Sequence, residues 1–346
     1  MNEFPITMTE LTSEWLSVAL GTPIAAFDAE PLGEGVGVIG LVTRVKLVSS
    51  SGPKSVIAKF ASEVPENRAV GETYDMYGKE FRFYTEVAPS IPLRIPICYH
   101  ASYNPETHDF VLLLEDLDSH RVGDQIAGCD AHDTENVIKS LACLHANTWR
   151  PSYNQLISHN NPAQCQGMIA GFQLGWPVVL KQFAELVPDS AKNIGDKMPL
   201  AIPRLLEAMC QDPVCLSQGD SRLDNILFGK DEVVIIDWQA IASSAPEHDL
   251  AYFLTQSLSQ EVFEAKDWPA IYHAELTRLG IDYSLTHCRE RFRVCALYLL
   301  CYAVVIAGTL DLANERGELM ARTLLGNSLR SLDSLNAFEL LTDVGD

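Results

Sequence analysis

Asp220, Asn225 and Asp237 have the residue types and the spacing of a site that handles metal and phosphate. Asp220 and Asn225 are five residues apart in QGDSRLDNILF, and Asp237 follows twelve residues later at the end of the run VVIID. Transfer of a phosphoryl group to a hydroxyl requires an acid that accepts the hydroxyl proton, together with oxygen ligands for Mg²⁺. These three side chains supply such groups, although Asp and Asn are also common in ordinary turns.

The residues around this loop predict that strands hold it. The runs ILF and VVIID are short, apolar and partly β-branched, and the polar residues Gly229 to Glu232 separate them. This pattern is typical of a hairpin, so Asp237 is expected at the end of its second strand. In protein kinases an Asp, four further residues and an Asn also precede a metal-binding Asp on the next hairpin.

A second set of candidate residues lies near the start of the chain. Gly33, Gly35 and Gly37 precede the alternating stretch 41–48, which predicts a strand. A dinucleotide-binding glycine motif would have to open a helix, so this one is not of that type. A glycine turn between two strands covers nucleotide phosphates in kinase-like folds, whereas the alternative is a merely flexible hairpin.

Lys59 is predicted in the middle of the next strand, SVIAKFA. A lysine there is either a solvent-facing residue of an edge strand or a phosphate-binding residue that faces a cleft. Strand alternation places Ile57 on the same face as Lys59, where it is expected to lie against a nucleotide base. A helix is predicted over residues 71–89, and it carries two acids that could pair with Lys59, Glu72 and Glu80.

These motifs, in their order, resemble the aminoglycoside phosphotransferase and choline kinase superfamily, and most closely its ecdysteroid-kinase-like branch. The resemblance spans roughly residues 30 to 310 and is carried by KEFRFYTEVAP, LLLEDL, LACLHA, QGDSRLDN and IDWQ. One position departs from the family pattern: Gln218 stands where the family usually has His. That His is a scaffold residue in the resemblance, so Gln218 affects the loop's hydrogen bonding more than the chemistry. Asp249 resembles the family's acid that holds this loop in place, and it is also explained as an acid at a helix N-terminus.

The resemblance implies roles for the candidate residues. Asp220 is expected to orient the acceptor hydroxyl and accept its proton, and Asn225 and Asp237 are expected to hold Mg²⁺. Arg222 is placed to contact the transferring phosphate, with an ion pair to Asp224 as the alternative. The expected ATP-binding residues are the glycine turn (Gly33, Gly35, Gly37), Ile57, Lys59, Glu80 as the partner of Lys59 with Glu72 as runner-up, and the backbone of Glu115 and Leu117 at the hinge.

The implied fold is an α+β, two-lobed protein-kinase-like fold. Residues 1–113 are expected to form an N-lobe with an antiparallel sheet and a helix, and residues 114–120 a hinge. Residues 121–346 are expected to form a larger, mainly helical C-lobe with the catalytic loop and substrate-binding helices. The implied activity is ATP- and Mg²⁺-dependent phosphorylation of a small-molecule hydroxyl, on a sterol, amino alcohol, aminoglycoside, sugar or hydroxyacyl compound.

Composition narrows the classes of partner. The formal net charge of −21 argues against binding to nucleic acid or to anionic membranes, because both require basic surface. Nine cysteines without a CxxC pair, and no signal-peptide pattern at the start, favour a reduced, cytoplasmic protein. The uncharged stretch 294–310 has 17 residues, and we expect a buried core helix there in preference to a membrane span.

Two other functions are compatible with the sequence. A nucleotide-binding pseudokinase is suggested only by Gln218. A protein kinase is disfavoured because Ala245-Pro246-Glu247 follows Asp237 by only eight residues, which leaves no room for a segment that docks a peptide.

Overall fold

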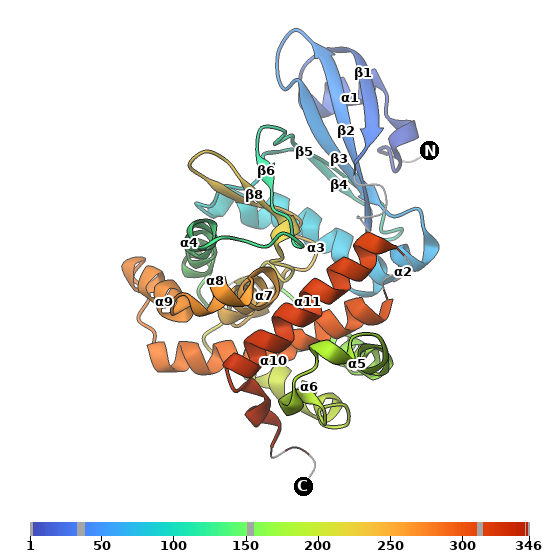
Figure 1. The fold of residues 1–346 in the computed structure, drawn as a ribbon. Helices are drawn as coiled ribbons and strands as arrows, with labels where there is room; N and C mark the ends of the chain where they lie inside the picture. Colours follow the sequence, from blue (N-terminus) through green and yellow to red (C-terminus); the bar gives the residue numbers. More distant parts are fainter. Residues whose placement is uncertain (1–2, 33–38, 151–155, 310–313, 343, 345–346) are drawn as a thin grey trace. The chain divides into compact units, whose positions relative to one another are not determined.

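The computed structural model describes residues 3–32, 39–150, 156–309, 314–342 and 344. The chain divides into two compact units: unit 1 is Met1–Arg121 with Ile236–Ala240, and unit 2 is Val122–Ile235 with Ile241–Asp346. The predicted α+β class is confirmed, because an antiparallel sheet and many helices make up the described residues (Figure 1). The predicted nucleotide-binding glycines Gly33, Gly35 and Gly37 lie outside the described residues.

Unit 1 is built on a five-stranded antiparallel sheet in the order β1-β2-β3-β5-β4. Its strands are β1 (Ile24–Pro31), β2 (Gly40–Ser49), β3 (Ser55–Ala61), β4 (Cys98–Tyr103) and β5 (Phe110–Glu115). Its helices are α1 (Ser13–Leu20), α2 (Pro65–Thr73) and α3 (Met76–Arg82), with the short turns η1 (Met8–Glu10), η2 (Phe83–Val87) and η3 (Ala88–Ser90). The two-residue strand β6 (Arg121–Val122) lies at the boundary of the two units in the sequence.

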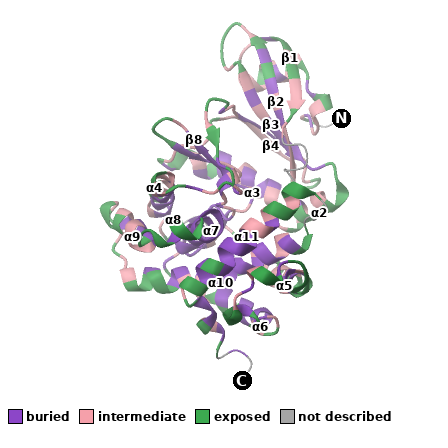
Figure 2. Cartoon of the chain, viewed as in Figure 1, coloured by how far each residue is buried: buried purple, intermediate pink, exposed green. Residues whose placement is uncertain are grey.

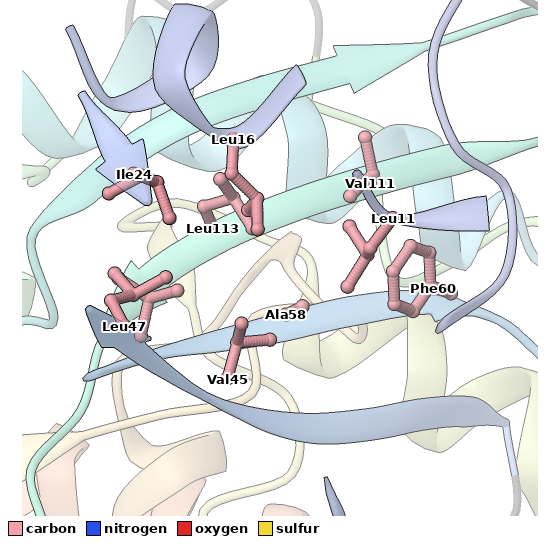
Figure 3. Packing of buried hydrophobic residues seen from close by; sticks show 10 residues of the cluster. Leu11, Leu16, Ile24, Val45, Leu47, Ala58, Phe60, Val111 and Leu113 are labelled. Carbon is pink, nitrogen blue, oxygen red and sulfur yellow. The ribbon is translucent and has the colours of Figure 1, made fainter. Parts of the chain in front are cut away.

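One face of this sheet forms the core of unit 1. Apolar side chains from Leu11, before α1, and from α1, β1, β2, β3 and β5 meet there (Figure 3): Leu11, Leu16, Ile24, Val45, Leu47, Val56, Ala58, Phe60, Val111 and Leu113. Every second residue of β3 belongs to this cluster, so Ile57 and Lys59 lie on the opposite face. The core therefore fixes the side of the sheet on which Lys59 lies.

The helix expected over residues 71–89 is interrupted. α2 ends at Thr73 and α3 begins at Met76, because Asp75 between them has a left-handed backbone, with φ of 51°. A left-handed residue cannot continue a right-handed helix. Asp75 is held by an ion pair with Arg82. The interruption makes α3 a separate short helix, and Glu80 lies on it.

Unit 2 is mainly helical. Its helices are α4 (Ala131–Asn147), α5 (Pro162–Gln182), α6 (Lys197–Met209), α7 (Glu247–Ser257), α8 (Gln260–Glu264), α9 (Trp268–Arg278), α10 (Leu285–Thr309) and α11 (Glu315–Ser334). The short helical turns are η4 (Ala184–Leu186), η5 (Asp189–Ala191), η6 (Leu223–Asn225) and η7 (Ala337–Leu341). β7 (Cys215–Ser217) pairs antiparallel with β10 (Ala242–Ser244), and β8 (Ile226–Phe228) pairs antiparallel with β9 (Val233–Ile235) in a sheet of the order β6-β8-β9. The second pair is the hairpin expected after Asn225.

α10 and α7 form the interior of unit 2. α10 packs against α5, α7 and α11 (Figure 1). Within the described ranges it is the helix long and apolar enough to cross a membrane, yet 61% of its most apolar window is buried inside the protein. All eleven residues of α7 are buried, including Glu247, His248 and Asp249 (Figure 2). Buried charges are costly unless they are paired, so the side chains of α7 are expected to have specific partners.

Candidate active-site residues

Lys59, Glu80 and Asp237 form a buried ionic cluster within unit 1. The Lys59 ammonium lies 2.8 Å from each carboxylate oxygen of Glu80 and 2.9 Å from Oδ1 of Asp237. Lys59 and Glu80 are buried, whereas the side chain of Asp237 is 31% exposed. Glu72, the alternative partner, is bound to Arg68 at 2.9 Å. The structure therefore brings Lys59 together with Glu80.

The cluster keeps Lys59 protonated. Burial lowers the pKa of the Lys59 ammonium, but the charges and hydrogen bonds of Asp237 and Glu80 outweigh this and raise the pKa overall. Burial raises the pKa of Glu80, and the attraction of Lys59 only partly offsets it. The Lys59 ammonium thus contacts the carboxylates of Glu80 and Asp237 in an environment with little solvent. A phosphate and its counter-cation would meet this cluster at Asp237, its most exposed member.

The backbone at Asp237 is strained, and its neighbours fix it. Asp237 has φ of 59°, a left-handed conformation that non-glycine residues adopt rarely, and such strain concentrates at functional sites. The fully buried Trp238 stacks on Phe83 with ring centroids 3.8 Å apart and planes 7° apart. The amide of Trp238 donates to Oε1 of Glu80 at 3.3 Å. The sequence analysis did not predict that Trp238 fixes the position of Asp237. The signal that could have indicated it is the aromatic residue directly after Asp237 in IDWQ.

Ile57 and the stretch Glu115–Leu117 are the expected base-binding residues. Ile57 is half-buried on the Lys59 face of β3. The amide of Glu115 donates to the carbonyl of Ile97 at 2.8 Å, and its carboxylate binds Arg94 at 2.8 Å through both oxygens. The Glu115 amide is therefore already used within the protein, which leaves Leu117 as the amide donor of the two expected hinge residues.

In unit 2, a buried carboxylate holds the loop that carries Asp220. Asp249 accepts hydrogen bonds from the Ser217 hydroxyl (2.7 Å) and from the amides of Gln218 (2.7 Å) and Gly219 (2.9 Å). Nε2 of His145 lies 3.1 Å from Oδ2 of Asp249. Burial raises the pKa of Asp249, but the hydrogen bonds and charges of His145 and His248 outweigh it and hold the pKa well below its usual range. Asp249 is therefore an ionised anchor for residues 217–219.

Gln218 holds the turn that follows. Its side chain is fully buried, and its Oε1 accepts from the amide of Asp220 at 2.8 Å and from the Ser221 hydroxyl at 3.1 Å. Gly219 between them has φ of 86°, a left-handed conformation that suits glycine. Gln218 thus supplies an acceptor to the loop, which is a function that a neutral imidazole nitrogen can also provide.

Asp220, Asn225 and Arg222 meet at the end of this loop. Asn225 Nδ2 donates to the carbonyl and to Oδ2 of Asp220, both at 2.9 Å. Arg222 Nε lies 3.5 Å from Oδ2 of Asp220. Asp224, the alternative partner of Arg222, accepts the amide of Gln125 at 3.0 Å. The Asp220 side chain is 28% exposed, so its carboxylate is both oriented by neighbours and open to solvent.

The donor set fits a magnesium ion that is bound chiefly through phosphate. Among the residues that the structure describes, no three His, Cys, Asp or Glu side chains form a group that could hold a metal by themselves. Mg²⁺ is usually held by one or two protein oxygens, water and substrate phosphates. Both hydrogen bonds from the Asn225 side chain to Asp220 use its nitrogen, so its Oδ1 is the atom that could bind a metal in unit 2. In unit 1, the partly exposed carboxylate of Asp237 offers a ligand of the same kind.

Comparison with solved structures shows a two-lobed, kinase-like fold. Choline kinase from Cryptosporidium parvum Iowa II is 11% identical, with a TM-score of 0.59 over 91% of each chain. The GDP complex of aminoglycoside 2′-phosphotransferase-IIIa is 15% identical, with a TM-score of 0.53 over 95% of this chain and 100% of that one. Ethanolamine kinase from Plasmodium vivax is 11% identical, with a TM-score of 0.51 over 89% of this chain and 84% of that one.

These likenesses confirm the predicted fold class. No curated protein matches the chain. The family model of the ecdysteroid kinase-like family matches residues 35–282, which include Lys59, Glu80, Asp220, Asn225 and Asp237. The match covers more than half of the chain, and it agrees with the resemblance seen in the sequence motifs. The chain therefore belongs to the ecdysteroid kinase-like family.

Proposed function

We propose that this protein transfers the γ-phosphoryl group of ATP to a hydroxyl group of a small molecule. Family membership and fold support a kinase-like phosphotransferase. The observation that carries the proposal is the loop in unit 2, where Asn225 and Arg222 orient a partly exposed Asp220 carboxylate while the buried Asp249 holds the loop backbone. A carboxylate that is oriented and accessible is what removal of a hydroxyl proton requires.

Each residue then has a chemical role. Asp220 accepts the proton of the acceptor hydroxyl at its carboxylate, and Arg222 stabilises negative charge beside it. Lys59 contacts phosphate oxygens, and Glu80 keeps its ammonium in position. Asn225 Oδ1 and the Asp237 carboxylate are the proposed ligands of Mg²⁺. When bound, ATP would supply the transferable phosphoryl group and Mg²⁺ would neutralise the charge on its oxygens.

The nucleotide in this proposal is supported by the relatives. One related structure is a GDP complex of an aminoglycoside phosphotransferase, and others are a choline kinase and an ethanolamine kinase. ATP is proposed as the donor, with Ile57 against its base and Leu117 as the amide donor at the hinge. All nine cysteines are free, which supports the proposal of a reducing, cytoplasmic location.

Gln218 gives little support to the pseudokinase alternative. Its amide oxygen bonds the Asp220 amide and Ser221 inside the loop, so replacement of the usual His leaves the loop with an acceptor at this point. A protein kinase would consume ATP only when a protein substrate is added, so ATP turnover on a small molecule alone would exclude this alternative.

An ATP-consumption screen tests the proposal. The wild-type protein and Asp220→Asn are incubated with ATP and Mg²⁺ over a set of hydroxyl-bearing metabolites, and ADP is measured together with the product mass. We expect at least one metabolite to gain a phosphate in the wild type and to lose nearly all of that turnover with Asp220→Asn. Nucleotide binding without turnover on any small molecule would instead support the pseudokinase.

A further inference from the structure

Gln125 lies in unit 2, on the segment that follows β6, and its side chain is fully buried. Its Oε1 accepts hydrogen bonds from the backbone amide of Leu223 (2.7 Å) and from the Ser257 hydroxyl (3.1 Å). Its Nε2 donates to the backbone carbonyl of Gln256 at 2.6 Å. Gln256 and Ser257 are the last two residues of α7. One neutral side chain therefore joins the loop that carries Asp220 to the end of α7.

The part of the loop that Gln125 binds is the turn η6, which ends at Asn225. Leu223 is the first residue of η6, and its amide is the one that Oε1 of Gln125 accepts. Asp224 is the second, and its Oδ1 accepts the backbone amide of Gln125 at 3.0 Å. Asn225 is the third, and its amide donates to the carbonyl of Arg222 at 3.0 Å. Gln125 thus holds the two residues that directly precede the proposed metal ligand.

The backbone next to Gln125 lies against the same turn. The amide of Gly123 donates to the carbonyl of Ile226 at 2.8 Å. A side chain at Gly123 would meet the carbonyl oxygen of Leu223 at 2.2 Å, which is closer than non-bonded atoms approach. The absence of a side chain at this position therefore permits the close approach that brings Gln125 within reach of η6.

Through Gln125, one helix holds both ends of the loop. Asp249, in the first turn of α7, accepts the amides of Gln218 and Gly219 at the start of the loop. Gln125 connects Leu223, near the end of the loop, to the last turn of α7. The two ends of α7 are about 10 Å apart along the helix axis, and every residue of this helix is buried. Both attachments therefore rest on a fixed interior element.

We propose that Gln125 is a positioning residue for phosphoryl transfer: it holds η6 so that Asn225 presents its amide oxygen to the metal and its amide nitrogen to Asp220. This inference rests on the proposed function. Without Gln125, the buried amide of Leu223 loses its acceptor, and η6 must move for that amide to find another. A displacement of about 1 Å in a site of this kind can lower turnover by about a hundredfold.

The test compares the wild type with Gln125→Met, which keeps the size of the side chain and removes its amide, and with Gly123→Ala. Gln256→Met is the matched control. That side chain is equally buried, but its Nε2 donates to the carbonyl of Leu299 on α10 at 3.0 Å, and the backbone carbonyl that Gln125 uses is unchanged. Melting temperature and hydrogen exchange are measured for all four proteins. The acceptors found in the ATP-consumption screen then give kcat, the acceptor KM and the Mg²⁺ concentration for half-maximal turnover.

We expect Gln125→Met and Gln256→Met to lower the melting temperature by similar amounts, roughly 2–5 °C, because each removes a buried hydrogen-bonding group. Gln125→Met should lower kcat by about tenfold or more and raise the Mg²⁺ requirement by about fivefold or more, with the acceptor KM within about twofold. Gly123→Ala should change kcat and the Mg²⁺ requirement in the same direction. Gln256→Met should leave both near their wild-type values. Peptides that cover residues 222–226 should exchange faster in Gln125→Met and Gly123→Ala, but not in Gln256→Met.

Three results would overturn the inference: wild-type kcat and Mg²⁺ requirement in Gln125→Met, equal changes in Gln125→Met and Gln256→Met, or unchanged exchange at residues 222–226 in Gln125→Met. Hydrogen exchange requires no turnover, so it tests the hold of Gln125 on η6 independently of activity. A wild type that phosphorylates no small molecule would refute the proposed function, and the two failures are therefore distinguishable.

Discussion

Replacement of Asp249 by Asn should destabilise the protein because no orientation of an amide can satisfy the loop. Oδ1 of Asp249 accepts from the Ser217 hydroxyl and the Gly219 amide, and Oδ2 accepts from the Gln218 amide and His145. Ser217 can rotate its hydroxyl, and His145 can change tautomer. The two backbone amides cannot adapt, and they use different oxygens. One of them must therefore face the NH₂ group of the introduced asparagine in either orientation.

The loss of stability in Asp249→Asn can be estimated from the hydrogen bonds that the substitution removes or weakens. A buried amide left without an acceptor costs about 1–3 kcal/mol, and the other hydrogen bonds lose their charged acceptor, so the free energy of unfolding should fall by about 2–5 kcal/mol. For a chain of 346 residues, with an unfolding entropy of about 2.1 cal/mol/K per residue, the melting temperature should fall by about 3–7 °C. Turnover should fall more than about tenfold, since the loop that orients Asp220 loses its anchor.

Thermal melting and hydrogen exchange measure these effects. Peptides that cover residues 216–219 should exchange faster in the variant, whereas peptides of the unit 1 sheet should not. Asp189→Asn is the control, because that side chain is 93% exposed, and its melting temperature should stay within about 1 °C of the wild type. A fall of less than about 2 °C for Asp249→Asn, with unchanged exchange at 216–219, would refute the reasoning.

The contribution of Asp249 should also depend on pH in a defined direction. Its pKa in the folded protein lies below that in the unfolded chain, so the stabilisation is fully present above the unfolded pKa of about 3.9 and is lost as the pH falls through the folded value. The difference in stability between wild type and Asp249→Asn should therefore not narrow between about pH 8 and about pH 5, and should narrow only in stronger acid. A difference that narrowed near neutral pH would assign the effect to another group.

Further substitutions test the remaining assignments. Asp220→Asn should lower kcat by about a hundredfold or more while calorimetry shows nearly unchanged ATP affinity, and an unchanged rate would remove Asp220 from the mechanism. Lys59→Met leaves the Glu80 and Asp237 carboxylates without their cation, so both the melting temperature and the nucleotide affinity should fall, the affinity by more than about tenfold. The double variant Lys59→Met/Glu80→Met removes one of these carboxylates and should recover the melting temperature but not nucleotide binding. Recovery of both the melting temperature and nucleotide binding would contradict the proposal that Lys59 contacts phosphate. Gln218→Ala removes the acceptor of the Asp220 amide and should lower turnover by about tenfold, whereas Gln218→His should be tolerated, with at most a modest new loss of activity below about pH 6.5. Loss of turnover in Gln218→His but not in Gln218→Ala would show that this side chain meets a substrate.

Local patterns carried much of the fold and of the candidate site. The alternation in β3 was enough to place Ile57 and Lys59 on one face, because the apolar residues between them fill the core on the other. The runs ILF and VVIID formed the expected hairpin. These features depend on neighbours in sequence, which is why the sequence could predict them.

Features that depend on distant contacts could not be predicted in this way. Trp238 stacks on Phe83, which is 155 positions away in the sequence, and no residue near IDWQ indicates that Phe83 is the partner of Trp238. Arg222 faces Asp220, while Asp224 is occupied by an amide 99 residues away. α7 is buried all round although its sequence is polar enough for a surface helix. Tertiary contacts outweighed local preference in each case.

The most direct test of the central claim follows the phosphate itself. Protein is incubated with ATP labelled in the γ-phosphate, Mg²⁺ and a small-molecule extract, and label is measured in small molecules other than the nucleotide, in inorganic phosphate and in protein. We predict label in a small-molecule phosphate ester for the wild type, and its loss in Asp220→Asn with ATP binding retained. Label that appears only in protein, or an Asp220→Asn variant that labels the small-molecule fraction as well as the wild type does, would contradict the proposed function.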